Sequence, residues 1–201
     1  MKEPGNIKEL WKLPVDYMGL IFYAKSPRFA EGIDPKDMEV MPSYIERVGV
    51  FVNAEKEYIV SMIERYKLDL VQLHGNESVT FCKEINNIIP VMKALNVSEI
   101  SDFKQAEPYK DVCRYFLFDT KTPHHGGSGI KFDWDILDSY QMDVPFFLSG
   151  GISPDDVKDI LKINHPMLYA IDLNSRFETE PGIKNIESLK QFIKHIRNEQ
   201  N

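Results

Sequence analysis

The first candidate for a functional site is a pair of glycines that follows a short apolar run, because their backbone N–H groups could bind an anion. Residues 144–148 are typical of a buried strand, and Gly150 and Gly151 follow directly. A helix is predicted next, with Ser153 as its N-cap and Pro154 in its first turn. A strand that runs through glycines into a capped helix leaves backbone N–H groups that suit a phosphate. A tight loop that binds no ligand would have the same sequence, so both interpretations stay open.

Polar residues also follow the other apolar runs of the chain. In parallel α/β folds, ligands bind at the carboxyl ends of the strands, so these residues are candidates for a shared site. They are Ser26-Pro27-Arg28, Asn53, His74-Gly75, Asn96, Asp119, Gly150-Gly151 and Asn174-Ser175.

The elements that must position these residues alternate between strand and helix. Such alternation predicts βα units around a parallel sheet, and the near-continuous apolar runs predict strands that are covered on both faces. Strands are predicted at 15–23, 47–53, 68–75, 88–96, 114–120, 144–148 and 167–174. Helices are predicted at 6–13, with Asn6 as a possible cap, and at about 34–46, 55–66, 77–87, 99–106, 133–140, 154–163 and 185–197. Seven strands with eight helices suggest an eightfold barrel that lacks its first strand.

The composition of the chain argues against several classes of protein. The 201 residues are long enough for one domain, 1–201, with a substantial core, and the formal charge of −7 without a Lys/Arg-rich run argues against nucleic acid as a partner. The apolar runs are too short to span a membrane, and the N-terminus has no signal-peptide pattern. Cys82 and Cys113 form no metal-binding spacing. We therefore expect a cytoplasmic, metal-free, single-domain protein.

Several stretches together resemble one enzyme family. The sequence resembles phosphoribosylanthranilate isomerase, a TIM (β/α)8-barrel enzyme of tryptophan biosynthesis. The resemblance implies an isomerase that converts an aldose into a ketose by an Amadori rearrangement of phosphoribosylanthranilate, without metal or organic cofactor. The matching stretches are M-K-E-P-G-N-I, D-Y-M-G-L-I-F-Y-A-K-S-P-R, V-G-V-F-V-N, V-Q-L-H-G, F-L-F-D-T, H-G-G-S-G-I-K-F-D-W, F-L-S-G-G-I-S-P-D-D-V and E-T-E-P-G-I-K-N.

The resemblance implies a role for two charged residues. Asp119 matches the general acid that protonates the furanose ring oxygen, although an aspartate that caps a loop is the structural alternative. Arg28 matches the residue near the anthranilate carboxylate, which suits the planar guanidinium, and a solvated loop arginine is its alternative. His74 is expected at the same end of the barrel. It either binds the substrate or is hydrogen-bonded to the backbone, and its role stays open.

The resemblance also implies a phosphate site, and composition predicts a mobile loop. Gly150, Gly151, Asn174 and Ser175 lie at the last two strand ends, where barrels commonly bind phosphate. Arg176 stands where the family often has glycine, and the sequence does not decide whether it contacts phosphate or solvent. The glycine-rich loop 120–129 could close over the substrate or be an ordinary connection.

The family's catalytic base is absent from the sequence. That base is a cysteine in a K-x-C-G-M segment, and alignment of M-K-E-P-G-N-I places it two residues before Met1. Cys113 precedes Asp119 by six residues on one strand, about 20 Å away, and Cys82 lies in an outer helix. We therefore expect a chain that begins after the first strand, with little turnover and with exposed sheet edges that invite a homodimer.

Two alternatives compete with the isomerase. The first is a non-catalytic barrel that binds a phosphorylated aromatic ligand. The second is another phosphate-binding barrel such as indoleglycerol-phosphate synthase, which fits less well because that enzyme uses a lysine and glutamate set at its strand ends.

Overall fold

Seven parallel strands form one sheet in the order β1-β2-β3-β4-β5-β6-β7. The computed structural model describes residues 1–30, 32–120 and 133–198. Every predicted strand is present close to its predicted position, which confirms the seven-stranded parallel sheet. The strands are β1 Tyr17–Ile21, β2 Glu46–Phe51, β3 Leu70–Leu73, β4 Val91–Val97, β5 Tyr115–Thr120, β6 Phe146–Leu148 and β7 Leu168–Ile171.

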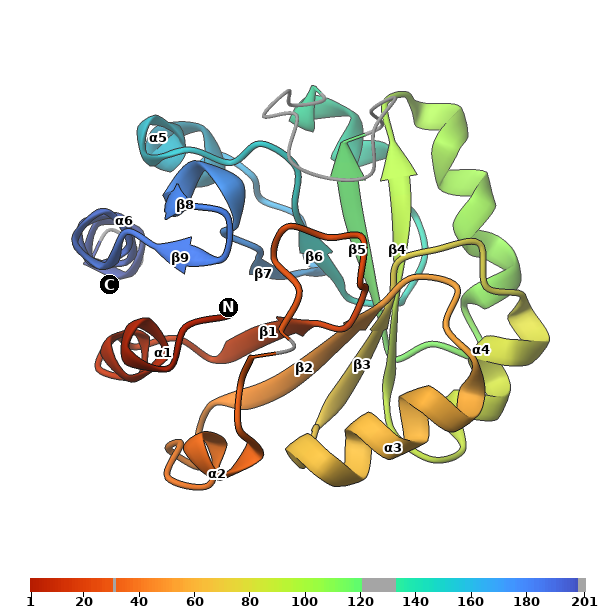
Figure 1. Ribbon diagram of the computed structural model, residues 1–201. Coiled ribbons are helices and arrows are strands. Elements are labelled where there is room, and N and C mark those ends of the chain that lie inside the picture. Colours follow the sequence, from red (N-terminus) through yellow and green to blue (C-terminus); the bar gives the residue numbers. More distant parts are fainter. Residues whose placement is uncertain (31, 121–132, 199–201) are drawn as a thin grey trace.

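Helical segments connect the strands along the outside of the sheet (Figure 1). In the described ranges there are eight such segments and one additional 3-10 turn, η4 (Ser175–Phe177), in agreement with the prediction of eight helices. None of them is long and apolar enough to cross a lipid bilayer. The segments are α1 Pro4–Leu10, α2 Pro35–Met38, α3 Lys56–Tyr66, α4 Val79–Asn86, η1 Ile100–Tyr109, η2 Trp134–Ser139, η3 Pro154–Asp156 continued by α5 Val157–Ile160, and α6 Ile186–Asn198.

Two details of the helix prediction were wrong. The helix expected over 34–46 is only α2, which ends at Met38, and Pro42 follows closely, where it disfavours helical backbone in the preceding residue. Asn6 does not cap α1, because the carboxylate of Glu3 accepts the N–H groups of the first turn instead. Asn6 pairs with the backbone of Lys184, donating to its carbonyl at 2.8 Å and accepting its N–H at 2.7 Å.

A short hairpin follows β7 and was not predicted. Strands β8 (Glu178–Glu180) and β9 (Ile183–Lys184) pair antiparallel, and Gly182 turns between them with φ of 88°. That left-handed backbone favours glycine, because a side chain there is strained. The hairpin places Glu178 opposite Lys184.

The two edges of the sheet face each other across an open side. Among the described residues no strand lies between β1 and β7, so the barrel is incomplete. Figure 1 shows α1, α6 and the β8–β9 hairpin gathered on this side. The rings of Tyr17 and Tyr169 approach across it, with centroids 6.5 Å apart. The amino group of Met1 donates to the carbonyl oxygen of Gly19 on β1 at 3.1 Å.

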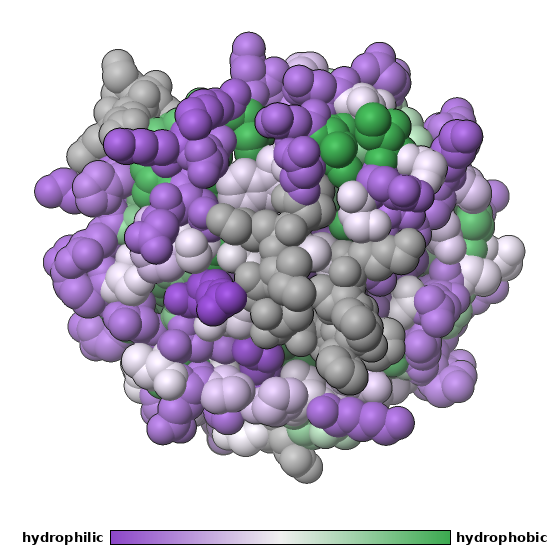
Figure 2. Space-filling model, turned by 90° about the horizontal axis from the view of Figure 1, so that it is seen from above, coloured by the Kyte–Doolittle hydropathy of each residue, from purple (hydrophilic) through white to green (hydrophobic). Residues whose placement is uncertain are grey.

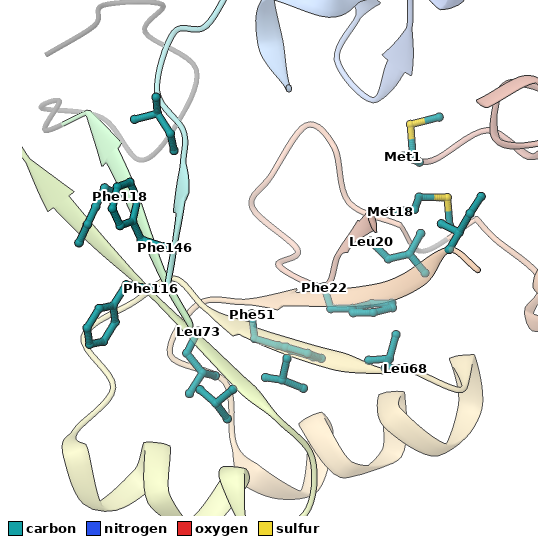
Figure 3. Close-up of a cluster of buried hydrophobic side chains, with 14 of the residues drawn as sticks. Met1, Met18, Leu20, Phe22, Phe51, Leu68, Leu73, Phe116, Phe118 and Phe146 are labelled. Carbon is teal, nitrogen blue, oxygen red and sulfur yellow. The ribbon is translucent and has the colours of Figure 1, made fainter. Parts of the chain in front are cut away.

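The core has two layers because side chains alternate across each strand. The inner layer fills the barrel with Val48, Leu70, Met92, Ala94, Tyr115, Leu117 and Phe147. The larger outer layer packs between the sheet and the helices and includes Phe51, Phe116, Phe118 and Phe146, as Figure 3 shows. The alternation decides which polar residues at the strand ends point into the barrel.

Candidate active site

Asp119 faces the barrel interior because of its place in β5. It lies two residues after Leu117 and four after Tyr115, both of which belong to the inner layer. Its side chain is 17% exposed, and its Oδ1 accepts the N–H of Thr120 at 2.9 Å. Asp119 therefore presents a fixed carboxylate at the carboxyl end of the strand.

His74 lies beside Asp119. Its Nε2 is 3.4 Å from Oδ2 of Asp119, and its Nδ1 is 2.8 Å from the amide nitrogen of the buried Gln72. Because an amide nitrogen can only donate, Nδ1 accepts that bond and the neutral ring carries its proton on Nε2. The His74 side chain is therefore held by other side chains and not by the backbone, which was one of its two alternatives. Its ring bridges two other side chains.

Gly150 and Gly151 end β6 with left-handed backbone, at φ of 90° and 70°. A Cβ on Gly150 would lie 2.2 Å from Oγ1 and 2.6 Å from the backbone nitrogen of Thr120. Only glycine allows the two strand ends to approach so closely. Ser153 begins the following helical segment as predicted, and its N–H and hydroxyl both donate to Asp156.

Arg28 lies in the loop after β1 and is not solvated. Its Nε donates to both carboxylate oxygens of Glu178, at 3.1 and 2.9 Å, and its Nη2 lies 2.7 Å from Oε2. The side chains are 16% and 4% exposed. Burial raises the pKa of Glu178, but the bonds from Arg28 and the charge of Lys184 outweigh it and hold that pKa below its ordinary value.

Asn174 and Ser175 follow β7, and Asn174 is held by Lys184. Its ammonium donates to the carbonyl oxygens of Leu173 and Asn174, each at 3.1 Å, and to Oδ1 of Asn174 at 2.8 Å. Burial lowers the pKa of Lys184, and the negative charges of Glu178 and Asp172 oppose that change. Arg176, in contrast, is exposed at the surface.

Sequence reasoning missed four residues of this region, namely Ser149, Asp172, Glu178 and Lys184. Asp172 follows β7 and accepts a hydrogen bond from the hydroxyl of Ser149 at 2.9 Å. Burial raises the pKa of Asp172, although Lys184 and that hydrogen bond act in the opposite direction. Asp172 follows an apolar strand just as Asp119 does, and that signal could have identified it.

One cavity of about 1080 Å³ brings these residues together. It extends along the open side between β1 and β7, from the strand ends down to Tyr17 and Tyr169. All seven site residues that the sequence predicted line it: Arg28, His74, Asp119, Gly150, Gly151, Asn174 and Ser175. Seen from above, the described residues are mainly hydrophilic (Figure 2). The lining of the cavity combines apolar strand residues with the cations Arg28 and Lys184, so the cavity can hold an anionic molecule that has an apolar part.

The two cysteines lie elsewhere. Cys82 and Cys113 are both buried and are not joined by a disulfide, and neither lines the cavity. Within the described part of the chain no group of three or more His, Cys, Asp or Glu side chains is arranged to hold a metal ion. The loop predicted to close over the substrate, 120–129, lies outside the described residues from position 121 onward.

Known proteins resemble this chain over almost its whole length. A family model described as N-(5'phosphoribosyl)anthranilate (PRA) isomerase matches residues 1–195. An N-(5'-phosphoribosyl)anthranilate isomerase of Parabacteroides distasonis is 42% identical over 199 residues, which cover 98% of this chain and 90% of that protein. The crystal structure of phosphoribosyl anthranilate isomerase from Thermotoga maritima has a TM-score of 0.84 at 35% identity, covering 98% and 96% of the two chains.

A further solved structure contains a ligand. It is a phosphoribosyl anthranilate isomerase in complex with reduced 1-(o-carboxyphenylamino)-1-deoxyribulose 5-phosphate, with a TM-score of 0.81 at 32% identity, covering 98% of this chain and 95% of that one. The match to the family model and the 42% identical relative agree with the barrel-like sheet and its cavity. The chain belongs to the N-(5'-phosphoribosyl)anthranilate isomerase family.

Proposed function

We propose that this chain catalyses the Amadori rearrangement of N-(5-phosphoribosyl)anthranilate to 1-(2-carboxyphenylamino)-1-deoxyribulose 5-phosphate. The observation that carries the proposal is the Asp119–His74 pair, which faces one cavity together with Arg28 and the Gly150-Gly151 turn. An acid, a cation for a carboxylate and a loop for a phosphate are the groups that this substrate needs. The names of the relatives support the same assignment.

Asp119 is the proposed acid. Ring opening requires a proton on the furanose oxygen, and the Asp119 carboxyl group supplies it from the end of β5. His74 orients this carboxyl group through its Nε2 proton, because Gln72 fixes the opposite ring nitrogen as an acceptor. The two residues therefore act as one unit, with Asp119 transferring the proton and His74 setting its direction.

The two anionic ends of the substrate bind at separate groups of the cavity lining. Arg28 receives the anthranilate carboxylate, because a guanidinium matches a planar carboxylate. Backbone N–H groups at Gly150, Gly151 and Ser175 receive the phosphate, with Asn174 held in place by Lys184. The aromatic ring and the sugar lie between them in the cavity.

The site lacks a cysteine that could act as the base and remove the proton from sugar C2. Neither Cys82 nor Cys113 lines the cavity, so we expect the 201-residue chain to turn over slowly. The same observation favours the second candidate function, a barrel that binds the phosphorylated aromatic ligand without converting it.

An assay of phosphoribosylanthranilate fluorescence tests the proposal. Loss of fluorescence should be slow for this chain and should slow further, by about 10²-fold or more, in Asp119→Asn. Asp111→Asn, an exposed aspartate before β5, serves as the control and should leave the rate unchanged.

A variant extended ahead of Met1 by a segment ending in Cys-Gly should be faster. If Asp119→Asn leaves the rates of both forms unchanged, Asp119 is not the acid; if neither form has activity, the binding-protein function is favoured.

We also propose a homodimer and a cytoplasmic location. The edge of β7 has no second strand neighbour in the described chain and supplies a surface for a second copy, since open strand edges readily add another strand. Membership of a family of biosynthetic isomerases supports the cytoplasmic location, which cell fractionation can test.

A further inference from the structure

The carboxylate of Glu178 occupies one edge of the Arg28 guanidinium. It accepts from Nε at 2.9 and 3.1 Å and contacts Nη2 at 2.7 Å. A guanidinium has two edges that can bind a carboxylate, and the edge formed by Nε and Nη2 is the one that Glu178 takes. The remaining edge, formed by Nη1 and the second proton of Nη2, has no acceptor among the described residues, and Arg28 lines the cavity.

Lys184 contacts the same carboxylate from another side chain. Its ammonium lies 3.3 Å from Oε1 of Glu178, and both side chains are less than a tenth exposed. The negative charge of Glu178 is therefore shared by two cations, Arg28 and Lys184, which leaves the second edge of Arg28 available to another carboxylate.

We propose that Glu178 is a positioning residue for the substrate carboxylate, holding Arg28 so that its second edge meets the anthranilate group. This inference rests on the proposed function, because it takes Arg28 as the carboxylate-binding residue. Glu178 does not touch the substrate and acts through Arg28. The two residues are 150 positions apart, so no local pattern in the sequence shows this relation.

A purely structural role for Glu178 is the competing explanation. Its Oε1 also accepts the N–H of Gly182 at 3.1 Å, so it holds the β8–β9 turn together. Loss of that role would weaken every ligand of the site alike. A positioning role, in contrast, is specific to ligands that carry the carboxylate.

Two ligands separate these explanations in a calorimetric titration. One is reduced 1-(o-carboxyphenylamino)-1-deoxyribulose 5-phosphate, and the other is the matching phenylamino compound without the carboxylate. In Glu178→Gln, an amide N–H replaces an acceptor beside the guanidinium, so the carboxylate ligand should bind about tenfold more weakly while the phenylamino ligand is unaffected. Glu180→Gln, on the same strand but exposed, is the matched control and should change neither affinity.

A double variant completes the test. Once Arg28→Ala has removed the guanidinium, adding Glu178→Gln should cost no further affinity for the carboxylate ligand. Equal weakening of both ligands in Glu178→Gln, or no weakening of either, would overturn the positioning role. If the unmodified chain does not prefer the carboxylate ligand, or if Arg28→Ala leaves that preference intact, the fault lies instead with the proposed role of Arg28.

Discussion

Asp172 makes the stability of the folded chain depend on pH. Burial raises the pKa of its carboxyl group above the ordinary value of 3.8. Between that value and the raised one, the folded chain binds more protons than the unfolded chain, so stability falls as pH rises through the folded pKa. Burial of this carboxyl group therefore lowers the stability of the fold at pH values above 3.8, and a pKa perturbed in this way beside a cavity points to a functional role.

Replacing Asp172 by asparagine should stabilise the chain. Asparagine keeps an acceptor for the Ser149 hydroxyl and cannot ionise, so the unfolding midpoint at pH 8 should lie above that of the unmodified protein. The difference should shrink as pH falls from the raised folded-state pKa to 3.8, because below 3.8 the aspartate is neutral in both the folded and the unfolded chain. Thermal unfolding followed across this pH range provides the measurement. Asp138→Asn, at an exposed position, should show no such trend, and a gap that stays constant with pH would contradict the explanation.

At the residue scale, the sequence could predict positions but not pairings. Asp119 and His74 were identified because each follows an apolar strand, and the alternation of a strand is a local property. The bond from Arg28 to Glu178 depends on how the loop after β1 meets a hairpin after β7, and no local pattern encodes that contact. Asp172 carried the same signal as Asp119 and could have been found.

At the scale of elements, the junction of β6 and η3 depends on one glycine. Gly150 has φ of 90° and lies against the backbone of Thr120, the residue next to Asp119. This contact sets the distance between the proposed phosphate loop and the proposed acid. Any side chain at position 150 must push the two strand ends apart.

The Gly150→Ala variant should be destabilised by about 1–3 kcal/mol, since it combines a left-handed backbone with a steric clash. It should also bind the phosphate-bearing ligand more weakly, because the loop moves relative to Asp119. Chemical denaturation and ligand titration measure the two effects. Gly32→Ala is the control, because a Cβ there meets nothing within 4 Å. Equal stability of both variants would show that the close approach at Gly150 is unimportant.

The order of elements was also predictable, because apolar runs and helix signals are local. The 3-10 form of η1 and η2, the short α2 and the β8–β9 hairpin were not predicted. Pro108 lies inside η1 and removes a backbone donor there, which agrees with its irregular form. The hairpin consists of very short strands, for which periodicity gives little information.

At the scale of the whole molecule, the open side of the sheet determines both the cavity and the proposed assembly. A closed barrel has no strand edges, whereas β1 and β7 each have one strand neighbour in the described chain. The open edge of β1 is partly occupied, because Gly19 and Ile21 accept hydrogen bonds from Met1 and Ala30. Tyr169 on β7 is 53% exposed beside this opening. The open edge of β7 and the exposed Tyr169 favour association with another edge.

Sedimentation should therefore show a concentration-dependent dimer. Tyr169→Lys introduces a charge at the edge of β7 and should shift the protein toward monomer, because charged residues discourage edge pairing. Ile100→Lys changes a residue of similar exposure, 56%, on the distant segment η1 and should leave the distribution unchanged. A protein that stays monomeric at all concentrations, or a dimer that tolerates Tyr169→Lys, would exclude pairing through this edge.

The most direct test of the central claim is a titration of the 201-residue chain with reduced 1-(o-carboxyphenylamino)-1-deoxyribulose 5-phosphate. This measurement needs no catalytic base, so it examines the cavity alone. We predict saturable one-to-one binding with a Kd below about 1 mM, weakened by Arg28→Ala and by competing inorganic phosphate. The absence of saturable binding, or binding indifferent to both changes, would contradict the assignment of this cavity as the isomerase site.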